Sequence, residues 1–251
     1  IGYRLNKHEK VIARNLSATI KQGELTCLIG TNGVGKSTLL RTLSGFQPKL
    51  SGGIRIGEKE IENYSNKELS RIIGVVLTEK VDARDMTVRE LVSLGRSPYT
   101  GFWGKPTTAD KEIVDEAIGL VQLEPLAERT VETLSDGERQ KAMIAKSLAQ
   151  QTPVIYLDEP TAFLDYPSKV DIIRLLKQLA KQEHKTVFFS THDLELALQL
   201  SDKLWLMSKE KGLQVGSIDE LMENGSLGSL FQNKFITFDT ETQLFRITNN
   251  A

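Results

Sequence analysis

The chain has 251 residues, of which 39% are hydrophobic and 26% are charged, so it can bury a sizeable core beneath an ordinary polar surface. Its formal net charge of -1 argues against a general nucleic-acid binder, because such proteins normally carry a basic excess. No apolar run is long enough for a membrane span, and the single cysteine, Cys27, excludes an intramolecular disulfide.

Predicted strands alternate with predicted helices along most of the chain, which is the pattern of an α/β fold with a mostly parallel sheet. The predicted strands are residues 25–29, 72–77, 154–157, 187–190 and 204–207. The predicted helices are residues 37–44, 113–121, 139–150, 168–182 and 194–200. Residues 51–61 alternate apolar and polar types around Gly57, which favours a small hairpin.

Two changes of pattern divide the chain. From residue 82 to residue 149 the sequence predicts helix after helix without a good strand, which indicates an inserted helical subdomain. Residues 1–81 and 150–225 are then expected to be the two parts of one core. After Gly225 two short apolar runs flank a polar turn, so residues 226–251 are expected to form a terminal hairpin.

A phosphate-binding loop is predicted where the strand at 25–29 passes into the helix at 37–44. The residues that match G-x-x-x-x-G-K-[ST], with the threonine that follows, are Gly30, Thr31, Asn32, Gly33, Val34, Gly35, Lys36, Ser37 and Thr38. Glycines let successive N–H groups turn inward around phosphate oxygens, and the helix N-terminus faces the same anion. Lys36 would place its charge near the β- and γ-phosphates of ATP, and Ser37 would offer its hydroxyl to Mg²⁺. A glycine-rich turn with a surface lysine is the structural alternative.

An acidic pair, Asp158 and Glu159, ends the predicted buried strand at 154–157. P-loop enzymes place an aspartate at such a strand end to hold Mg²⁺, commonly through water. Glu159 would then face the γ-phosphate and position or deprotonate the attacking water. A solvated acidic strand end is the alternative interpretation, and the phosphate loop upstream argues against it.

A third segment resembles the signature of ABC ATPases, usually written LSGGQ, and the resemblance covers essentially the whole chain. It reads Leu134-Ser135-Asp136-Gly137-Glu138-Arg139-Gln140. The resemblance implies a P-loop NTPase core, RecA-like, with an N-terminal antiparallel β subdomain and an inserted helical signature subdomain. It also implies contacts from the signature to the nucleotide bound by the opposite subunit, made by Ser135, Asp136, Gly137 and Glu138.

The resemblance implies roles for further residues. Tyr3 would stack on adenine, with an ordinary strand tyrosine as the alternative. Asp165, in Phe163-Leu164-Asp165, would cross the dimer interface. His192 would contact the γ-phosphate as the switch histidine, completing a catalytic set with Lys36 and Glu159.

The sequence departs from the family pattern at three positions. In the signature, Asp136 replaces a glycine and Glu138 replaces a glutamine. The family also carries a glutamine that touches Mg²⁺ or the lytic water and links the helical subdomain to the core. Thr78 stands at that position, followed by Glu79. Either side chain could reach the metal, and the sequence leaves the choice open.

Residues 86–99 and 134–141 are similar to ATPases of iron-siderophore, haem and cobalamin importers. That similarity implies a homodimer beneath permease subunits, on the cytoplasmic face of the cell membrane, with an extracytoplasmic binding protein and no nucleic acid. Two other functions stay open: a soluble ABC scaffold of the iron–sulfur assembly type and a low-turnover regulatory subunit. A chromosome-maintenance ATPase is disfavoured, because the span from Lys36 to Ser135 cannot hold a long coiled coil.

Overall fold

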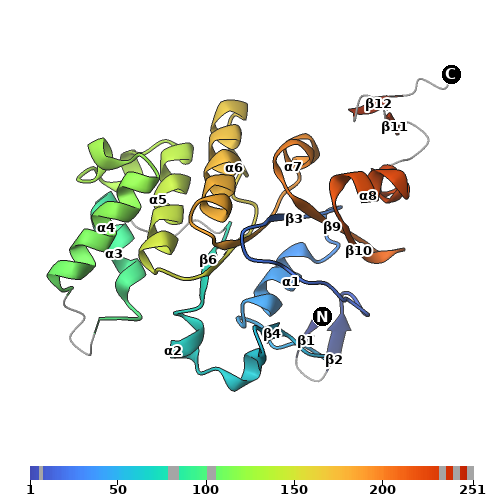
Figure 1. The fold of residues 1–251 in the computed structure, drawn as a ribbon, viewed down its shortest axis with the longest axis horizontal. Helices are drawn as coiled ribbons and strands as arrows, with labels where there is room; N and C mark the ends of the chain where they lie inside the picture. Colours follow the sequence, from blue (N-terminus) through green and yellow to red (C-terminus); the bar gives the residue numbers. More distant parts are fainter. Residues whose placement is uncertain (6–7, 79–84, 101–105, 232–235, 240–243, 248–251) are drawn as a thin grey trace.

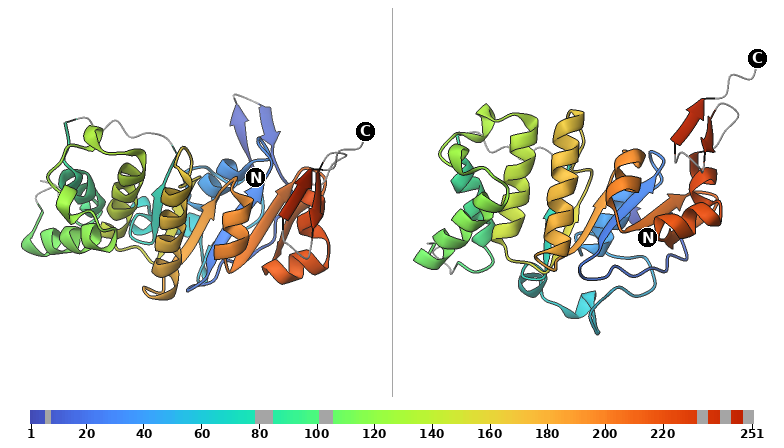
Figure 2. Two further views of the ribbon diagram at one scale, coloured as in Figure 1. Left: turned by 90° about the horizontal axis from the view of Figure 1, so that it is seen from above. Right: turned by 45° about the horizontal axis from the view of Figure 1, so that its top comes forward.

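The computed structural model describes residues 1–5, 8–78, 85–100, 106–231, 236–239 and 244–247. A central sheet lies between layers of helices, with a separate group of helices at one end of the molecule (Figure 1). The two further views show the same order of parts, with the hairpin β11–β12 at the opposite end from the helical group (Figure 2).

The central sheet has six strands in the order β10-β9-β3-β8-β7-β6. Their bounds are β3 Leu25–Gly30, β6 Ile73–Val76, β7 Val154–Leu157, β8 Thr186–Ser190, β9 Lys203–Ser208 and β10 Gly212–Gly216. All pairings are parallel except the one between β9 and β10. Every residue of β3 and β7 is buried, which explains why these strands read as continuous apolar runs.

Alternate residues of the central strands face opposite layers of helices. Cys27 of β3 belongs to the hydrophobic core that includes α6 (Tyr166–Lys181) and α7 (Leu194–Leu200). Its neighbour Leu28 belongs to a second core, which includes α1 (Lys36–Leu43). The sheet is therefore covered on both faces, as a mostly parallel sheet requires.

The helical group consists of α3 (Val88–Ser93), α4 (Thr108–Leu120) and α5 (Asp136–Ala149), which pack against one another. It carries a buried ion pair, in which Arg96 Nε donates to Asp110 Oδ1 over 2.8 Å. Arg96 also donates to the carbonyl of the last residue of α5. The ion pair therefore ties the start of α4 to the end of α5.

Replacing Asp110 with asparagine is expected to destabilise the fold by about 3 kcal/mol at neutral pH, because Arg96 would stay buried without its counter-charge. A backbone N–H of Thr107 and the Arg96 guanidinium lower the pKa of Asp110 from 3.8 to about 2. Because the folded-state pKa lies below the unfolded one, this stabilisation is present above pH 3.8 and is lost as the pH falls through about 2.

Urea unfolding should thus show that the difference in the free energy of unfolding between wild type and Asp110→Asn becomes smaller as the pH falls. Asp115→Asn is the control, since Asp115 is an exposed partner of Arg89 and its loss should cost less than about 1 kcal/mol. A difference that stays constant down to pH 2 would contradict this account of the ion pair.

Smaller elements complete the fold. The short strands are β1 Gly2–Leu5, β2 His8–Val11, β4 Arg55–Ile56, β5 Lys59–Glu60, β11 Ile236–Asp239 and β12 Leu244–Ile247, which form three antiparallel pairs. The short helices are α2 Asn66–Leu69, α8 Ile218–Glu223 and α9 Ser226–Phe231. The 3-10 segments are Ile61–Asn63, Leu94–Arg96, Glu124–Leu126 and Val131–Thr133.

The strands and helices predicted in the core are confirmed, and the hairpin predicted around Gly57 is the pair β4–β5. Three helices begin at least two residues earlier than predicted because a side chain caps each one. Thr107 accepts a hydrogen bond at the start of α4, Ser135 at the start of α5 and Asp165 at the start of α6. The segment predicted as a terminal hairpin was only partly right, since helix α9 precedes β11.

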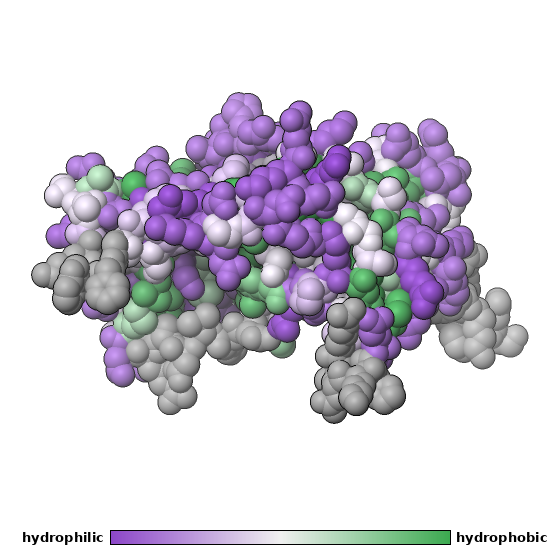
Figure 3. Space-filling model, turned by 90° about the horizontal axis from the view of Figure 1, so that it is seen from below, coloured by the Kyte–Doolittle hydropathy of each residue, from purple (hydrophilic) through white to green (hydrophobic). Residues whose placement is uncertain are grey.

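The molecular surface is mainly hydrophilic on the face seen from below, where hydrophobic residues form small separate groups (Figure 3). Within the described part of the chain, no helix is both long enough and apolar enough to span a membrane.

Candidate nucleotide-binding and catalytic site

The predicted phosphate loop joins the carboxyl end of β3, an interior strand of the sheet, to the start of α1. Gly33 and Gly35 have φ values of 73° and 113°, which side chains other than glycine rarely adopt. A methyl group on Gly35 would also lie 2.2 Å from Ile12 Cγ2. The loop thus needs glycine at position 35 for two reasons, its backbone conformation and the close approach of Ile12.

Lys36, the first residue of α1, folds back over the loop. Its Nζ donates to the Gly30 carbonyl over 3.0 Å, and only 5% of the residue is exposed. Burial lowers the pKa of Lys36, while the nearby carboxylates of Glu159 and Asp158 act in the opposite direction. A buried ammonium with acids beside it provides a fixed positive charge where a phosphate chain would bind.

The acidic pair follows β7, which lies between β6 and β8 in the sheet. Asp158 is buried, with 6% of its surface exposed, and its N–H donates to the Val76 carbonyl over 2.8 Å. Glu159 has a positive φ of 49°, uncommon for a residue with a side chain. Its carboxylate stays 25% exposed, so it remains open to a ligand and to water.

Three of the predicted site residues meet at this point. Glu159 Oε1 lies 2.5 Å from His192 Nε2 and 3.9 Å from Lys36 Nζ. Lys36 Nζ lies 3.3 Å from His192 Nε2. A carboxylate, an imidazole and an ammonium from three separate segments therefore converge beside the phosphate loop. This set can bind an anion and accept a proton from water.

The departure at Thr78 has a structural explanation. Thr78 Oγ1 donates to the Asp158 carbonyl over 2.7 Å, so the hydroxyl supports the acidic strand end. Glu79, the other candidate for a metal contact, lies outside the described residues.

Ser190, which the sequence analysis did not single out, belongs to the same site. Its Oγ donates to Asp158 Oδ1 over 2.7 Å and accepts from the Glu159 N–H over 3.0 Å. The only sequence signal for this role was its place two residues before His192, at the end of β8.

The predicted Mg²⁺ ligands, Ser37 and Asp158, provide a hydroxyl and a carboxylate oxygen. Such donors fit Mg²⁺, which protein sites hold through one or two carboxylates together with substrate phosphates and waters. No cluster of three or more metal-binding His, Cys, Asp or Glu residues occurs among the residues that the structure describes. An ion here would thus depend largely on the phosphates, and the metal roles of both residues stay predictions.

The predicted signature forms the N-terminus of α5. Ser135 Oγ accepts from the Glu138 N–H over 3.3 Å, and the Glu138 carboxylate accepts from the Ser135 N–H over 2.8 Å. This capping box lowers the pKa of Glu138, chiefly through the Ser135 N–H. Glutamate in place of the usual glutamine therefore stabilises the helix start, while the exposed Asp136 carboxylate lies 3.4 Å from Arg139.

Comparison with known proteins decides the family. The family model described as ABC transporter matches residues 13–162, a range that contains the phosphate loop, the signature segment and the acidic pair. An uncharacterized ABC transporter ATP-binding protein of Methanocaldococcus jannaschii, MJ0873, is 37% identical over 240 residues, 96% of this chain and 83% of that protein. The chain belongs to the ABC transporter family.

Other relatives of this ABC ATPase include named transport proteins. The ferric enterobactin transport ATP-binding protein FepC of Escherichia coli is 36% identical over 84% of this chain and 78% of its own length. An inward-facing transporter assigned to the metal-chelate type is 28% identical with a TM-score of 0.77, over 92% of this chain and 85% of that one. The dimeric cassette MJ0796, bound to ADP and Pi after hydrolysis, is 25% identical with a TM-score of 0.74, over 86% and 95%.

The predicted dimer loop of the ABC ATPase leads into α6. Asp165 Oδ1 accepts from the Ser168 N–H over 3.1 Å, which caps the helix. Hydrogen bonds from Ser168, first from its side chain and then from its N–H, lower the pKa of Asp165. Phe163, just before it, is 83% exposed and has a positive φ of 66°. One turn into α6, Lys169 Nζ lies 2.6 Å from Asp193 Oδ2, next to His192. The loop and the histidine segment are thus linked by an ion pair.

Tyr3 lies on β1 opposite Lys10, whose Nζ is 5.6 Å from the centre of its ring. Ile12, the residue directly after β2, lies close to Gly35 of the phosphate loop. The hairpin that carries Tyr3 is therefore joined to a segment that touches the phosphate loop. Its role as an adenine platform stays a prediction, as do the contacts of Ser135, Gly137 and Asp165 across a dimer.

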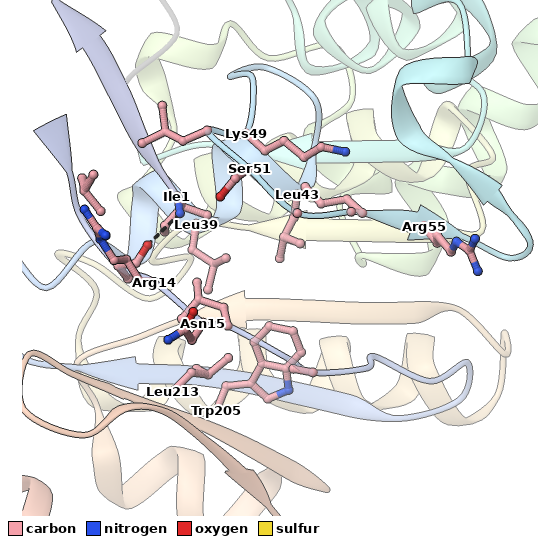
Figure 4. Close-up of a pocket in the computed structure, with 18 of the residues that line it drawn as sticks. Ile1, Arg14, Asn15, Leu39, Leu43, Lys49, Ser51, Arg55, Trp205 and Leu213 are labelled. Carbon is pink, nitrogen blue, oxygen red and sulfur yellow. Dashed lines mark hydrogen bonds between the residues drawn. The ribbon is translucent and has the colours of Figure 1, made fainter. Parts of the chain in front are cut away.

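A separate pocket of about 570 Å³ lies between the N-terminal segment, α1 and the strands β9 and β10 (Figure 4). Leu39, Leu43, Trp205 and Leu213 provide apolar side chains to its lining. Neither the acidic pair nor Lys36 lines it, so this pocket is distinct from the catalytic site.

Proposed function

We propose that this ABC ATPase energises the import of a metal chelate of the iron-siderophore, haem or cobalamin class, as a homodimer attached to permease subunits. The convergence of Lys36, Glu159 and His192 beside the phosphate loop carries the hydrolytic part of the proposal. Support for the cargo class comes from FepC, named for ferric enterobactin transport, and from the metal-chelate type transporter.

ATP would bind with its phosphates in the loop, where N–H groups, the α1 N-terminus and Lys36 all favour negative charge. Tyr3 would support the adenine. Ser37 and Asp158 would hold Mg²⁺, which supplies charge neutralisation between the phosphate oxygens when it is bound. Lys36 would exchange its contacts with Glu159 and His192 for contacts with the phosphates.

Hydrolysis would then depend on Glu159 and His192. The Glu159 carboxylate accepts a proton from the water that attacks the γ-phosphorus, and its partial exposure leaves room for that water. His192, in hydrogen-bonding distance of Glu159, would donate to the γ-phosphate and hold the carboxylate in place. Glu159 follows β7 and His192 follows β8, and the pairing of these two neighbouring strands fixes their separation.

Dimer closure would convert hydrolysis into movement. Ser135 and Gly137 of the signature would contact the γ-phosphate bound by the other copy, with Asp136 and Glu138 beside them at the nucleotide and Asp165 crossing the interface. Contacts made only with ATP would favour the closed dimer, and their loss on hydrolysis would open it. The dimeric structure of MJ0796 with ADP and Pi supports this arrangement for the family.

The permease would be the membrane-spanning partner, which places this chain at the cytoplasmic face of the cell membrane, with an extracytoplasmic binding protein delivering the chelate. The relevant test is affinity purification from detergent-solubilised source membranes. We expect an integral-membrane permease to co-purify, and the captured complex to hydrolyse ATP faster when a binding protein loaded with a ferric siderophore is added.

The control is the same binding protein without the chelate, which should stimulate less. Recovery with soluble proteins alone, and no stimulation, would instead favour the soluble scaffold function. A permease that co-purifies but whose complex responds only to a solute outside the iron-siderophore, haem and cobalamin classes would overturn the cargo assignment alone.

A further inference from the structure

A single peptide group, the one that joins Asp158 to Glu159, is held at both of its polar atoms by side-chain hydroxyls. Its carbonyl oxygen accepts from Thr78 Oγ1 over 2.7 Å. Its N–H donates to Ser190 Oγ over 3.0 Å. Ser190 Oγ also donates to Asp158 Oδ1 over 2.7 Å. The plane of this peptide is therefore fixed from two directions.

The two hydroxyls come from the strands on either side of the acidic pair. Thr78 follows β6, and Ser190 is the last residue of β8, while β7 lies between them. The register pairs Val76 with Leu157 and Leu157 with Phe189, so the carboxyl ends of all three strands lie at the same level. Each neighbour of β7 thus contributes one hydroxyl to the same peptide.

The peptide needs this support because of the backbone at Glu159. Its φ of 49° is disfavoured for a residue with a side chain, so surrounding contacts must maintain it. The φ angle sets the direction in which the Glu159 side chain leaves the backbone. That direction places Oε1 at 2.5 Å from His192 Nε2. Rotation of the peptide plane would move the carboxylate away from this position.

We propose that Thr78 and Ser190 are positioning residues, which hold the Asp158–Glu159 peptide so that the Glu159 carboxylate faces the attacking water. This inference rests on the proposed role of Glu159 in hydrolysis. It assigns Thr78 a function that needs no metal, because its hydroxyl donates to the Asp158 carbonyl. The chain thus uses a threonine to support the catalytic carboxylate of Glu159, at the position where the resemblance to ABC ATPases implies a glutamine.

Thr78→Val removes one hydrogen bond that orients a reacting group and is expected to lower kcat for ATP hydrolysis by about tenfold. Its KM for ATP and the Mg²⁺ concentration that gives half-maximal activity should stay within about twofold of wild type. Ser190→Ala removes two hydrogen bonds, one from the Glu159 N–H and one to Asp158 Oδ1, and should lower kcat by at least about tenfold. Thr78→Ser keeps the hydroxyl and should retain most of the wild-type kcat.

Thr152→Val is the matched control. Thr152 Oγ1 likewise donates to a backbone carbonyl of the β7 segment, that of Val154 at the other end of the strand, over 3.0 Å. Thr152 is buried whereas Thr78 is exposed, so the control removes a hydroxyl from the less accessible of the two positions. It should keep the wild-type kcat. If Thr78→Val instead raises the Mg²⁺ requirement and regains full kcat at saturating Mg²⁺, Thr78 is a metal ligand and the inference is wrong. Unchanged kinetics in both hydroxyl variants would overturn it as well.

Hydrogen exchange at the Glu159 amide tests the geometry without turnover. In the nucleotide-free protein, Ser190→Ala should speed exchange of this amide by about tenfold, while Thr152→Val leaves it unchanged. Equal protection in wild type and Ser190→Ala would contradict the inference. Failure of the wild-type protein to hydrolyse ATP would contradict the proposed function instead, so the two outcomes can be told apart.

Discussion

Glu159→Gln is expected to lower the kcat for ATP hydrolysis by at least about 100-fold while leaving ATP affinity within about threefold of wild type. Glutamine has nearly the same shape as glutamate, but its amide cannot accept a proton from the attacking water. The residue already lies beside His192 and Lys36, so its replacement removes the base without removing the phosphate loop. Phosphate release measures kcat, and titration with a fluorescent ATP analogue measures affinity.

The same variant should accumulate as an ATP-bound dimer, because hydrolysis no longer removes the contacts that keep the dimer closed. Light scattering in the presence of ATP and Mg²⁺ would detect the change in mass. Glu112→Gln is the control. It makes the same chemical change at an exposed glutamate on α4, outside the site. A Glu159→Gln protein that keeps a tenth or more of the wild-type rate would show that another group activates the water.

Lys36→Ala is expected to weaken ATP binding by about 100-fold, since it removes a buried charge from hydrogen bonds with phosphate oxygens. Burial around Nζ means that water replaces the ammonium poorly, and the carboxylates of Glu159 and Asp158 would then repel the phosphates. Calorimetric titration measures the loss directly. The rise in thermal stability on adding ATP should disappear at nucleotide concentrations that stabilise the wild type.

Lys185→Ala is a suitable comparison for that experiment. Lys185 is also a partly buried lysine whose pKa is lowered by burial, and its Nζ donates to the Thr152 carbonyl outside the site. Its replacement should affect the free energy of unfolding and leave ATP affinity unchanged. Equal ATP affinity in wild type and Lys36→Ala would contradict the assignment of residues 30–38 as the phosphate loop.

The parts of the site that the sequence predicted are encoded in consecutive residues. The phosphate loop requires glycines at set spacings, and β7 is a buried strand that ends in two acids. The place of His192 at the γ-phosphate was implied only by the resemblance to ABC ATPases. The structure explains it, because β7 and β8 are neighbouring parallel strands whose carboxyl ends lie together. Local patterns were sufficient for the phosphate loop and the acidic pair.

The remaining features depend on contacts between segments far apart in the sequence. The hydrogen bonds of Thr78 and Ser190 exist because β6 and β8 flank β7, and the spatial order of strands does not follow from their order in the chain. Strand β10 has glycine at both ends and gave little strand signal. The capping box of Ser135 and Glu138 could have been found from its S-x-x-E spacing.

We propose that two copies of this chain form one composite ATPase, with each signature completing the site of the other copy. The most direct test is the rate of ATP hydrolysis per chain, measured at saturating ATP and Mg²⁺ over a wide range of protein concentration. We predict that turnover per chain rises with concentration and then reaches a plateau as dimers form. A turnover per chain that stays constant at every concentration, in a protein that remains monomeric with ATP, would contradict the claim.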